Sequence, residues 1–145
     1  MGTRSPSTPQ GSIDSPLSAT EFALGCGARF VARGIDTLPK HLPEVFKRAH
    51  AHKGASFVEV FQNCIVYNDG VYDHFTAKDV AADRQILVEH GKPLIFGADS
   101  DQGIRMRPGK IELEVVTIGE DGITEADILV HDETNKVIAQ LLIGM

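Results

Sequence analysis

The feature that most constrains the fold of this 145-residue chain is a strand–helix–strand pattern between residues 28 and 61. The run from Ala28 to Ala32 is expected to be a strand, and Ser56 to Phe61 has the near-continuous apolar character of a parallel strand that is covered on both faces. Between these runs, apolar residues recur at helical spacing from Leu38 to Ala49. A strand, a helix and a strand within about 35 residues make one βαβ unit. We therefore predict an α/β fold.

Capping residues indicate where the helices begin and end. Ser18, with Glu21 three residues later, is typical of a capping box and predicts a short helix that stops at Gly25-Cys26-Gly27. In the second helix Pro43 suits the first turn, where its missing N–H costs nothing, and Lys53-Gly54 marks the end. The first 16 residues are rich in Ser, Thr, Pro and Gly and predict either a disordered tail or an extended loop.

The periodicity weakens beyond residue 63, and this shift divides the chain into residues 1–62 and 63–145. In the second part we expect a loop over residues 65–73 with a turn at Asn68-Asp69-Gly70, and a helical turn from Lys78 to Ala82. Further strands are predicted within residues 93–97, 110–118 and 128–130, and a terminal helix over residues 135–142.

Composition excludes several classes of function. The net charge of −6 comes with no basic stripe, which argues against a nucleic-acid partner. No apolar run approaches the roughly 20 residues that span a bilayer, so no membrane segment is expected. Nothing near the start has the charged and apolar regions of a signal peptide, and two cysteines make no disulfide framework. A cytoplasmic setting is therefore expected.

Cys64 is the main candidate for chemistry, because it comes shortly after the strand that ends at Phe61. A residue in that place lies at the carboxyl edge of an open α/β sheet, where ligands bind. Its position alone leaves two alternatives, a metal ligand or a buried structural thiol. No second cysteine stands at ligand spacing, so any other ligands must come from sequence that is not present here. Cys26, between two glycines, is expected to be a small core residue.

The remaining polar candidates carry weaker signals, and no catalytic or cofactor-binding residue is assigned. His50 and His52 are two residues apart on a helix and so point to different faces, which disfavours a shared metal. The turn at Asn68-Asp69-Gly70 is either plain turn chemistry or a functional contact near the sheet edge. Arg105 is either a solvated arginine or a contact for an anionic partner such as a substrate carboxylate or coenzyme A.

Several long runs of this sequence resemble the β subunit of 2-oxoacid:ferredoxin oxidoreductases, the group that includes 2-oxoglutarate synthases. The resemblance covers residues 11–142 and matches the C-terminal portion of that subunit. The runs that carry it are Ala23–Arg33, Pro39–Leu42, Ala51–Glu59, Gln62–Cys64, Tyr67–Gly70, Glu89–Gly97, Gly103–Arg105 and Ile118–Glu133.

The resemblance implies an enzyme with two cofactors. Thiamine diphosphate, held with magnesium, supplies the decarboxylation chemistry for a 2-oxoacid, for which 2-oxoglutarate is expected. Electrons leave through a [4Fe-4S] cluster to ferredoxin, and the acyl group passes to coenzyme A. Cys64 is similar in position to the fourth thiolate ligand of that cluster, and the partner is the α subunit of the same enzyme.

The sequence also departs from the family pattern. The CxxC pair, the third cysteine and the GDG-type motif that holds magnesium and diphosphate have no counterpart here. We therefore expect a C-terminal fragment, or a reading frame that starts at an internal Met, that is inactive by itself. Residues 1–62 would be the C-terminal half of the thiamine-diphosphate domain, and residues 63–145 an irregular extension of the β subunit.

Two alternatives remain open at this point. One is a non-catalytic interaction module that keeps only the subunit-binding surface. The other is a thiamine-dependent decarboxylase without a cluster.

Overall fold

The computed structural model describes residues 2, 4 and 6–145 of the chain, which forms two compact units, residues 1–71 and 72–145. Each unit has its own sheet, two-stranded in the first and three-stranded in the second. The assignment of residues 1–62 to a thiamine-diphosphate domain and of residues 63–145 to an extension stays a prediction.

The first helix, α1 (Ala19–Gly25), begins and ends where the sequence predicted. The hydroxyl of Ser18 accepts a hydrogen bond from the Glu21 N–H at 3.3 Å, which satisfies one of the free donors of the first turn. At the other end Gly27 has φ +86° and donates its N–H to the Leu24 carbonyl at 2.9 Å. A left-handed glycine in this place closes the helix in a Schellman motif.

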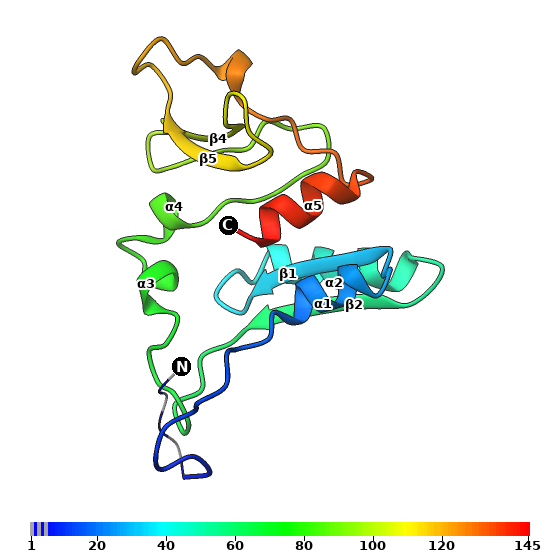
Figure 1. Ribbon diagram of the computed structural model, residues 1–145, viewed down its shortest axis with the longest axis vertical. Coiled ribbons are helices and arrows are strands. Elements are labelled where there is room, and N and C mark those ends of the chain that lie inside the picture. Colours follow the sequence, from blue (N-terminus) through cyan, green and yellow to red (C-terminus); the bar gives the residue numbers. More distant parts are fainter. Residues whose placement is uncertain (1, 3, 5) are drawn as a thin grey trace. The chain divides into compact units, whose positions relative to one another are not determined.

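The predicted βαβ unit is confirmed (Figure 1). Strand β1 (Phe30–Ile35) pairs in parallel with β2 (Ser56–Phe61), and the register runs from Phe30 opposite Ser56 to Ile35 opposite Phe61. Between them lies α2 (His41–Ala51), so Pro43 falls in the first turn as expected. The strand β1 begins two residues later than Ala28, because Gly27 and the residue after it close α1 first.

The two helices of this unit cover opposite faces of the sheet. Leu42 of α2 packs so closely on Gly34 that a Cβ at position 34 would lie 2.6 Å from its Cδ1. Arg33, the next residue of β1, donates instead to the Thr20 hydroxyl of α1 at 2.8 Å. Neighbouring residues of a strand point to opposite faces, so α1 and α2 form the outer layers of a three-layer arrangement.

The first unit has little core of its own. Val45 is the buried large apolar side chain among its described residues, and the sheet has two strands with no further strand on either outer edge in this part of the chain. Parallel sheets are normally covered on both faces and extended by further strands, because unpaired edges leave backbone groups without partners. Among the described residues, this unit therefore combines a small core with two unpaired sheet edges.

We expect this difference in core to appear in amide hydrogen exchange of the isolated chain. The amides of β1 and β2 should exchange at least about tenfold faster than those of the core strands of the second unit, because local opening is easier where few apolar contacts are buried. Exchange read by mass spectrometry on peptides would measure the ratio. Equal or stronger protection of β1 and β2 would show that the two-stranded sheet is self-sufficient.

The second unit is built around a three-stranded antiparallel sheet in the order β3-β4-β5. Its buried core consists of Leu94, Ile104 and Ile128, with partly buried apolar side chains packed around them. Along the chain its elements are α3 (Asp73–Thr76), α4 (Ala81–Arg84), β3 (Ile95–Phe96), β4 (Gln102–Met106), β5 (Leu113–Thr117), the 3-10 helix η1 (Glu125–Asp127) and α5 (Lys136–Ile143).

Some of the expected elements of this unit are confirmed. The strands predicted within residues 93–97 and 110–118 correspond to β3 and β5. The terminal helix corresponds to α5, where the Asn135 side chain caps the helix by accepting from the N–H groups of Val137 and Ile138.

Other expectations for this unit were wrong. The segment Ile128–Val130 is extended but forms one isolated bridge, from Val130 to Pro93, and no strand, because the Leu129 N–H and the Leu94 carbonyl both bond to Ile104 and not to each other. By contrast, the helical turn expected over residues 78–82 is confirmed in part, since the Ala81 N–H donates to the Ala77 carbonyl at 2.9 Å and α4 continues from Ala81. Strand β4 was not predicted, and with β3 and β5 it makes this part more regular than the expected extension.

The described part of residues 2–17 contains turns and no helix or strand element. The Gly2 N–H donates to the Ser12 carbonyl at 2.7 Å, and the Gly11 N–H donates to the Thr8 carbonyl at 2.9 Å. Residues 1, 3 and 5, which the expected tail also included, lie outside the described residues.

In the part of the chain that the structure describes, no helix combines the length and the apolar character needed to cross a membrane.

An ion-pair network lies across the β4–β5 pair. Glu114 accepts from Arg105 Nε at 2.8 Å and from Arg107 Nε at 2.9 Å, and Arg107 also pairs with Glu112. Arg105 and Glu114 stand directly opposite each other in the ladder. The hydrogen bonds from Arg105 and then Arg107 lower the pKa of Glu114. Arg105 is thus an internal ion-pair partner, and the structure offers no observation for the anionic-ligand alternative.

Glu114→Gln should make the second unit less sensitive to acid. A carboxyl whose pKa is lowered by folding stabilises the native state above its ordinary pKa, and this contribution is lost as pH falls through the lowered value. At neutral pH the variant should melt a few degrees below the parent chain, and the difference should shrink below about pH 4. Thermal melts followed by circular dichroism from pH 7 to pH 3 would test this. A difference that does not change with pH would contradict it.

Candidate functional site

The loop that carries Cys64 leaves the carboxyl end of β2, as expected from the sequence. The last residue of β2, Phe61, is fixed from two sides. Its carbonyl accepts the Asp36 N–H at 3.1 Å, and the Arg33 guanidinium lies 5.2 Å from the centre of its ring. Arg33 is in turn held by Glu59 at 2.7 Å, so the start of the loop is anchored to the face of the sheet that α1 covers.

Asn63 closes this loop with both ends of its side-chain amide. Its Nδ2 donates to the Asp69 carboxylate at 2.8 Å, and its Oδ1 accepts the Gly70 N–H at 3.0 Å. Inside this clamp Asn68 donates its N–H to the Cys64 carbonyl at 3.0 Å. The turn predicted at Asn68-Asp69-Gly70 is confirmed, while its partner Asn63 was missed by the sequence reasoning. The residue type could have indicated Asn63, since Asn side chains readily form hydrogen bonds to nearby backbone.

The clamped loop presents its middle residues to solvent. The exposed fractions are 78% for Ile65, 77% for Val66 and 71% for Tyr67, and Cys64 itself is exposed. Exposure of the thiol removes the alternative of a buried structural cysteine within the described chain. It also leaves the Sγ free of steric cover for a ligand that would come from outside this chain.

A complete cluster site does not fit the residues that the structure describes. An iron–sulfur cluster of the cubane type takes four thiolate ligands. No group of three His, Cys, Asp or Glu side chains among the described residues lies close enough to hold a metal ion. Cys26 was expected in the core but is exposed, because it caps the end of α1 where the chain turns outward. The metal role of Cys64 therefore stays a prediction.

The other polar candidates are explained by local contacts. His52 lies 5.6 Å from the Phe30 ring, and its Nδ1 is 3.2 Å from the Ser56 hydroxyl, so it does not share a site with His50. In the second unit His90 accepts the Glu133 N–H at 3.2 Å. This bond joins the segment before Pro93 to the segment after Val130, and these two segments also meet in the Pro93–Val130 bridge. These histidines connect structural segments and are not arranged around a common centre.

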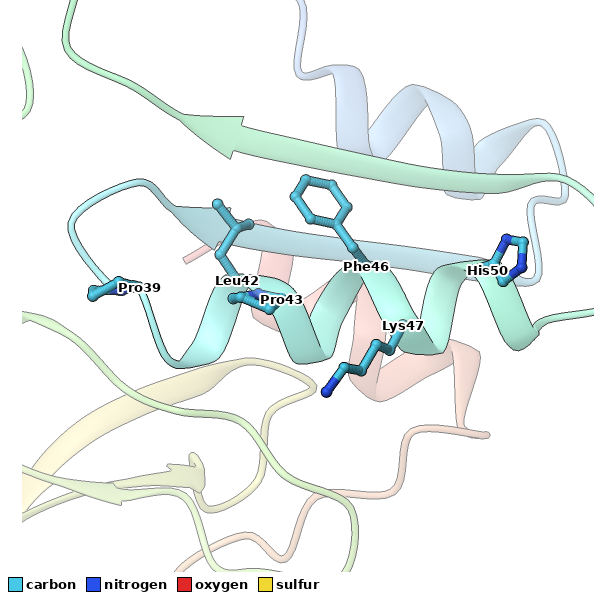
Figure 2. Close-up of a pocket in the computed structure, with 6 residues that line it drawn as sticks. All are labelled: Pro39, Leu42, Pro43, Phe46, Lys47 and His50. Atoms are coloured by element: carbon cyan, nitrogen blue, oxygen red, sulfur yellow. The ribbon is translucent and has the colours of Figure 1, made fainter.

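A second feature of the first unit is a shallow groove on α2, drawn in Figure 2. We call it the α2 groove; its volume is about 540 Å³, and its lining is almost wholly apolar carbon. Its lining residues follow α2 and the turn before it: Pro39, Leu42, Pro43, Phe46, Lys47 and His50. Phe46 is 48% exposed there, which is high for a phenylalanine beside a sheet.

The chain is similar, over most of its length, to part of an oxidoreductase subunit. More particularly, the curated relatives are β subunits of 2-oxoacid:ferredoxin and 2-oxoglutarate oxidoreductases. This confirms the resemblance that the sequence predicted.

The 2-oxoglutarate oxidoreductase subunit KorB of Mycobacterium tuberculosis is 39% identical over 132 residues, which are 91% of this chain and 34% of that relative. The 2-oxoacid:ferredoxin oxidoreductase subunit beta of Saccharolobus solfataricus is 39% identical over 69 residues, 48% of this chain and 23% of the relative. The 2-oxoglutarate synthase subunit KorB of Methanocaldococcus jannaschii is 32% identical over 66 residues, 46% of this chain and 24% of the relative.

The chain thus spans about a third of the length of the Mycobacterium relative and less of the archaeal ones. No protein-family model matches the chain, and no solved structure matches it. The α/β character is therefore established by the structure, while the thiamine-diphosphate-binding fold stays a prediction.

The clamp on the Cys64 loop can be tested by exchanging its two side chains. Asn63→Asp places two carboxylates within hydrogen-bond distance, so the exchange of the Asn68 and Gly70 amides should accelerate about tenfold. The double variant Asn63→Asp/Asp69→Asn recreates the bond with donor and acceptor reversed and should restore slow exchange. Amide exchange by nuclear magnetic resonance would measure both.

The amides of α2 serve as the internal control and should not change in either variant. If the double variant exchanges as fast as Asn63→Asp, the amide–carboxylate bond does not hold the loop.

Proposed function

We propose that this chain is part of the β subunit of a 2-oxoacid:ferredoxin oxidoreductase, which acts in the cytoplasm. The complete enzyme would release CO₂ from a 2-oxoacid, for which 2-oxoglutarate is favoured, and pass the acyl group to coenzyme A. The electrons would go to ferredoxin. The observation that carries this proposal is the 39% identity over 91% of the chain with a relative named 2-oxoglutarate oxidoreductase subunit.

The geometry of the first unit supports the view that the chain works as part of something larger. A two-stranded parallel sheet with unpaired edges and a small core is difficult to stabilise alone. Additional polypeptide of the β subunit and the α subunit would supply the missing strands and the rest of the active site. We infer that thiamine diphosphate and magnesium bind mainly through that additional polypeptide, because this chain has no GDG-type motif.

Within this proposal Cys64 is the residue of this chain that binds the [4Fe-4S] cluster. The anchored end of β2 and the Asn63 clamp would fix the position of its Sγ, so that little ordering is needed when the ligand binds. The cluster would carry electrons from the decarboxylation to ferredoxin.

A non-catalytic interaction module is the second candidate function. The observation that favours it is that no group of three potential ligands among the described residues could hold a metal ion. Such a module would keep the surface that contacts the other subunit and would bind neither cofactor in any longer form of the protein.

Iron, acid-labile sulfide and bound thiamine diphosphate should be measured on this chain and on a longer polypeptide extended upstream. The oxidoreductase proposal predicts both cofactors in the extended polypeptide only, with about four irons per β subunit. Cys64→Ala should then lose most of the iron, whereas the matched variant Cys26→Ala should keep it. Absence of both cofactors from both forms would overturn the proposal and leave the interaction module.

A further inference from the structure

We propose that the α2 groove is a docking surface for an acidic segment of a partner protein. This segment inserts apolar side chains into the groove and carries carboxylates on either side of them. The inference does not depend on the oxidoreductase proposal, because it rests on the chemistry of α2 alone. It starts from the groove itself, whose floor of Leu42, Phe46 and the two prolines is apolar and open to solvent.

The apolar floor gives the first requirement for the partner. Lining residues recur at positions 39, 42, 43, 46 and 50, so they form one stripe along the helix. A stripe of this kind receives apolar side chains that recur at a similar spacing on a second segment. The floor is also firm, because Leu42 is seated against Gly34 of β1 and Val45 is buried behind it.

Charge gives the second requirement. The segment from residue 40 to residue 53 contains four cations, Lys40, Lys47, Arg48 and Lys53, against one anion, Glu44, and so carries a net charge of +3. The whole chain carries −6. The helix is therefore a basic element on an acidic protein. Such a basic element attracts carboxylates and steers their approach, while it disfavours a basic partner.

One of these cations, Lys47, lies beside the floor, and Lys40 and Lys53 lie close to the ends of the groove in the sequence. Lys47 lines the groove directly, and its pair with Glu44 at 2.6 Å is exposed, so solvent screens it and a stronger partner can replace it. Lys40 directly follows Pro39 at one end of the groove, and Lys53 follows α2 at the other end. An occupant with carboxylates at both ends of an apolar stripe would match this pattern.

The probe is a fluorescein-labelled amphipathic peptide with leucines at helical spacing and glutamates at the remaining positions. Its matched control has lysine in place of every glutamate. Fluorescence anisotropy should show that the acidic peptide binds this chain at least about tenfold more tightly than the basic one, and that added salt weakens the binding.

Two variants and their matched controls assign the binding to the groove. Phe46→Ala removes floor area and Lys47→Glu reverses a rim charge, and each should weaken acidic-peptide binding about tenfold. Phe22→Ala removes an exposed phenylalanine from α1, and Lys78→Glu reverses an exposed lysine in the second unit; neither should change binding. Lys47→Glu alters an exposed side chain, so it remains informative even where Phe46→Ala unfolds the first unit.

Two results would overturn the proposal. The first is equal binding of the two peptides, or no difference between the groove variants and their controls. The second is self-association of the chain by analytical ultracentrifugation that Phe46→Ala abolishes, without binding of the acidic peptide. That result would assign the groove to a second copy of the chain, whose residues 72–145 carry 14 acidic side chains against 7 basic ones.

Discussion

The parallel pairing of β1 with β2 is the interaction on which the first unit depends. It places Arg33 directly opposite Glu59, and it brings the ends of the two strands together so that Asp36 can bond to the Phe61 carbonyl. The same pairing creates one face for α1 and another for α2. Parallel pairing also requires a crossover, which α2 provides, so the helix that closes the unit is a consequence of the sheet.

The site follows from this pairing. Because β2 ends at an anchored residue, the loop beyond it starts from a fixed point, and the Asn63 amide then fixes where it returns. Because the loop is held at both ends, it can keep a fixed conformation while Cys64 and three apolar neighbours are exposed. Exposure on this scale has an energetic cost that a second surface would remove. The loop therefore presents Cys64 and its apolar neighbours to solvent.

The sequence was sufficient where local physics decides the structure. The apolar run of β2, the stripe of α2 and the cap at Ser18 were all found at or near their observed places, because period and capping are local signals. Strand β4 was missed because only Ile104 and Met106 of its five residues are apolar, which is too few to establish a period, and the ladder with β5 makes this segment a strand. The run Ile128–Val130 misled for the opposite reason, since its apolar residues serve the core while the backbone groups that would extend the bridge bond to Ile104.

The candidate site was predictable in part. The position of Cys64 after β2 came from strand order, but its exposure and its clamp depend on bonds from Asn63 to residues six and seven positions away, which no period reveals. A ligand role for Cys64 was one of two alternatives that its position left open, and the family resemblance favoured it. Residues 40–53 are instructive here, because the sequence shows their net charge of +3 but not which surface the charges border. Only the structure showed that one of these cations, Lys47, lines an apolar groove, and this is the observation from which the proposed docking surface is argued.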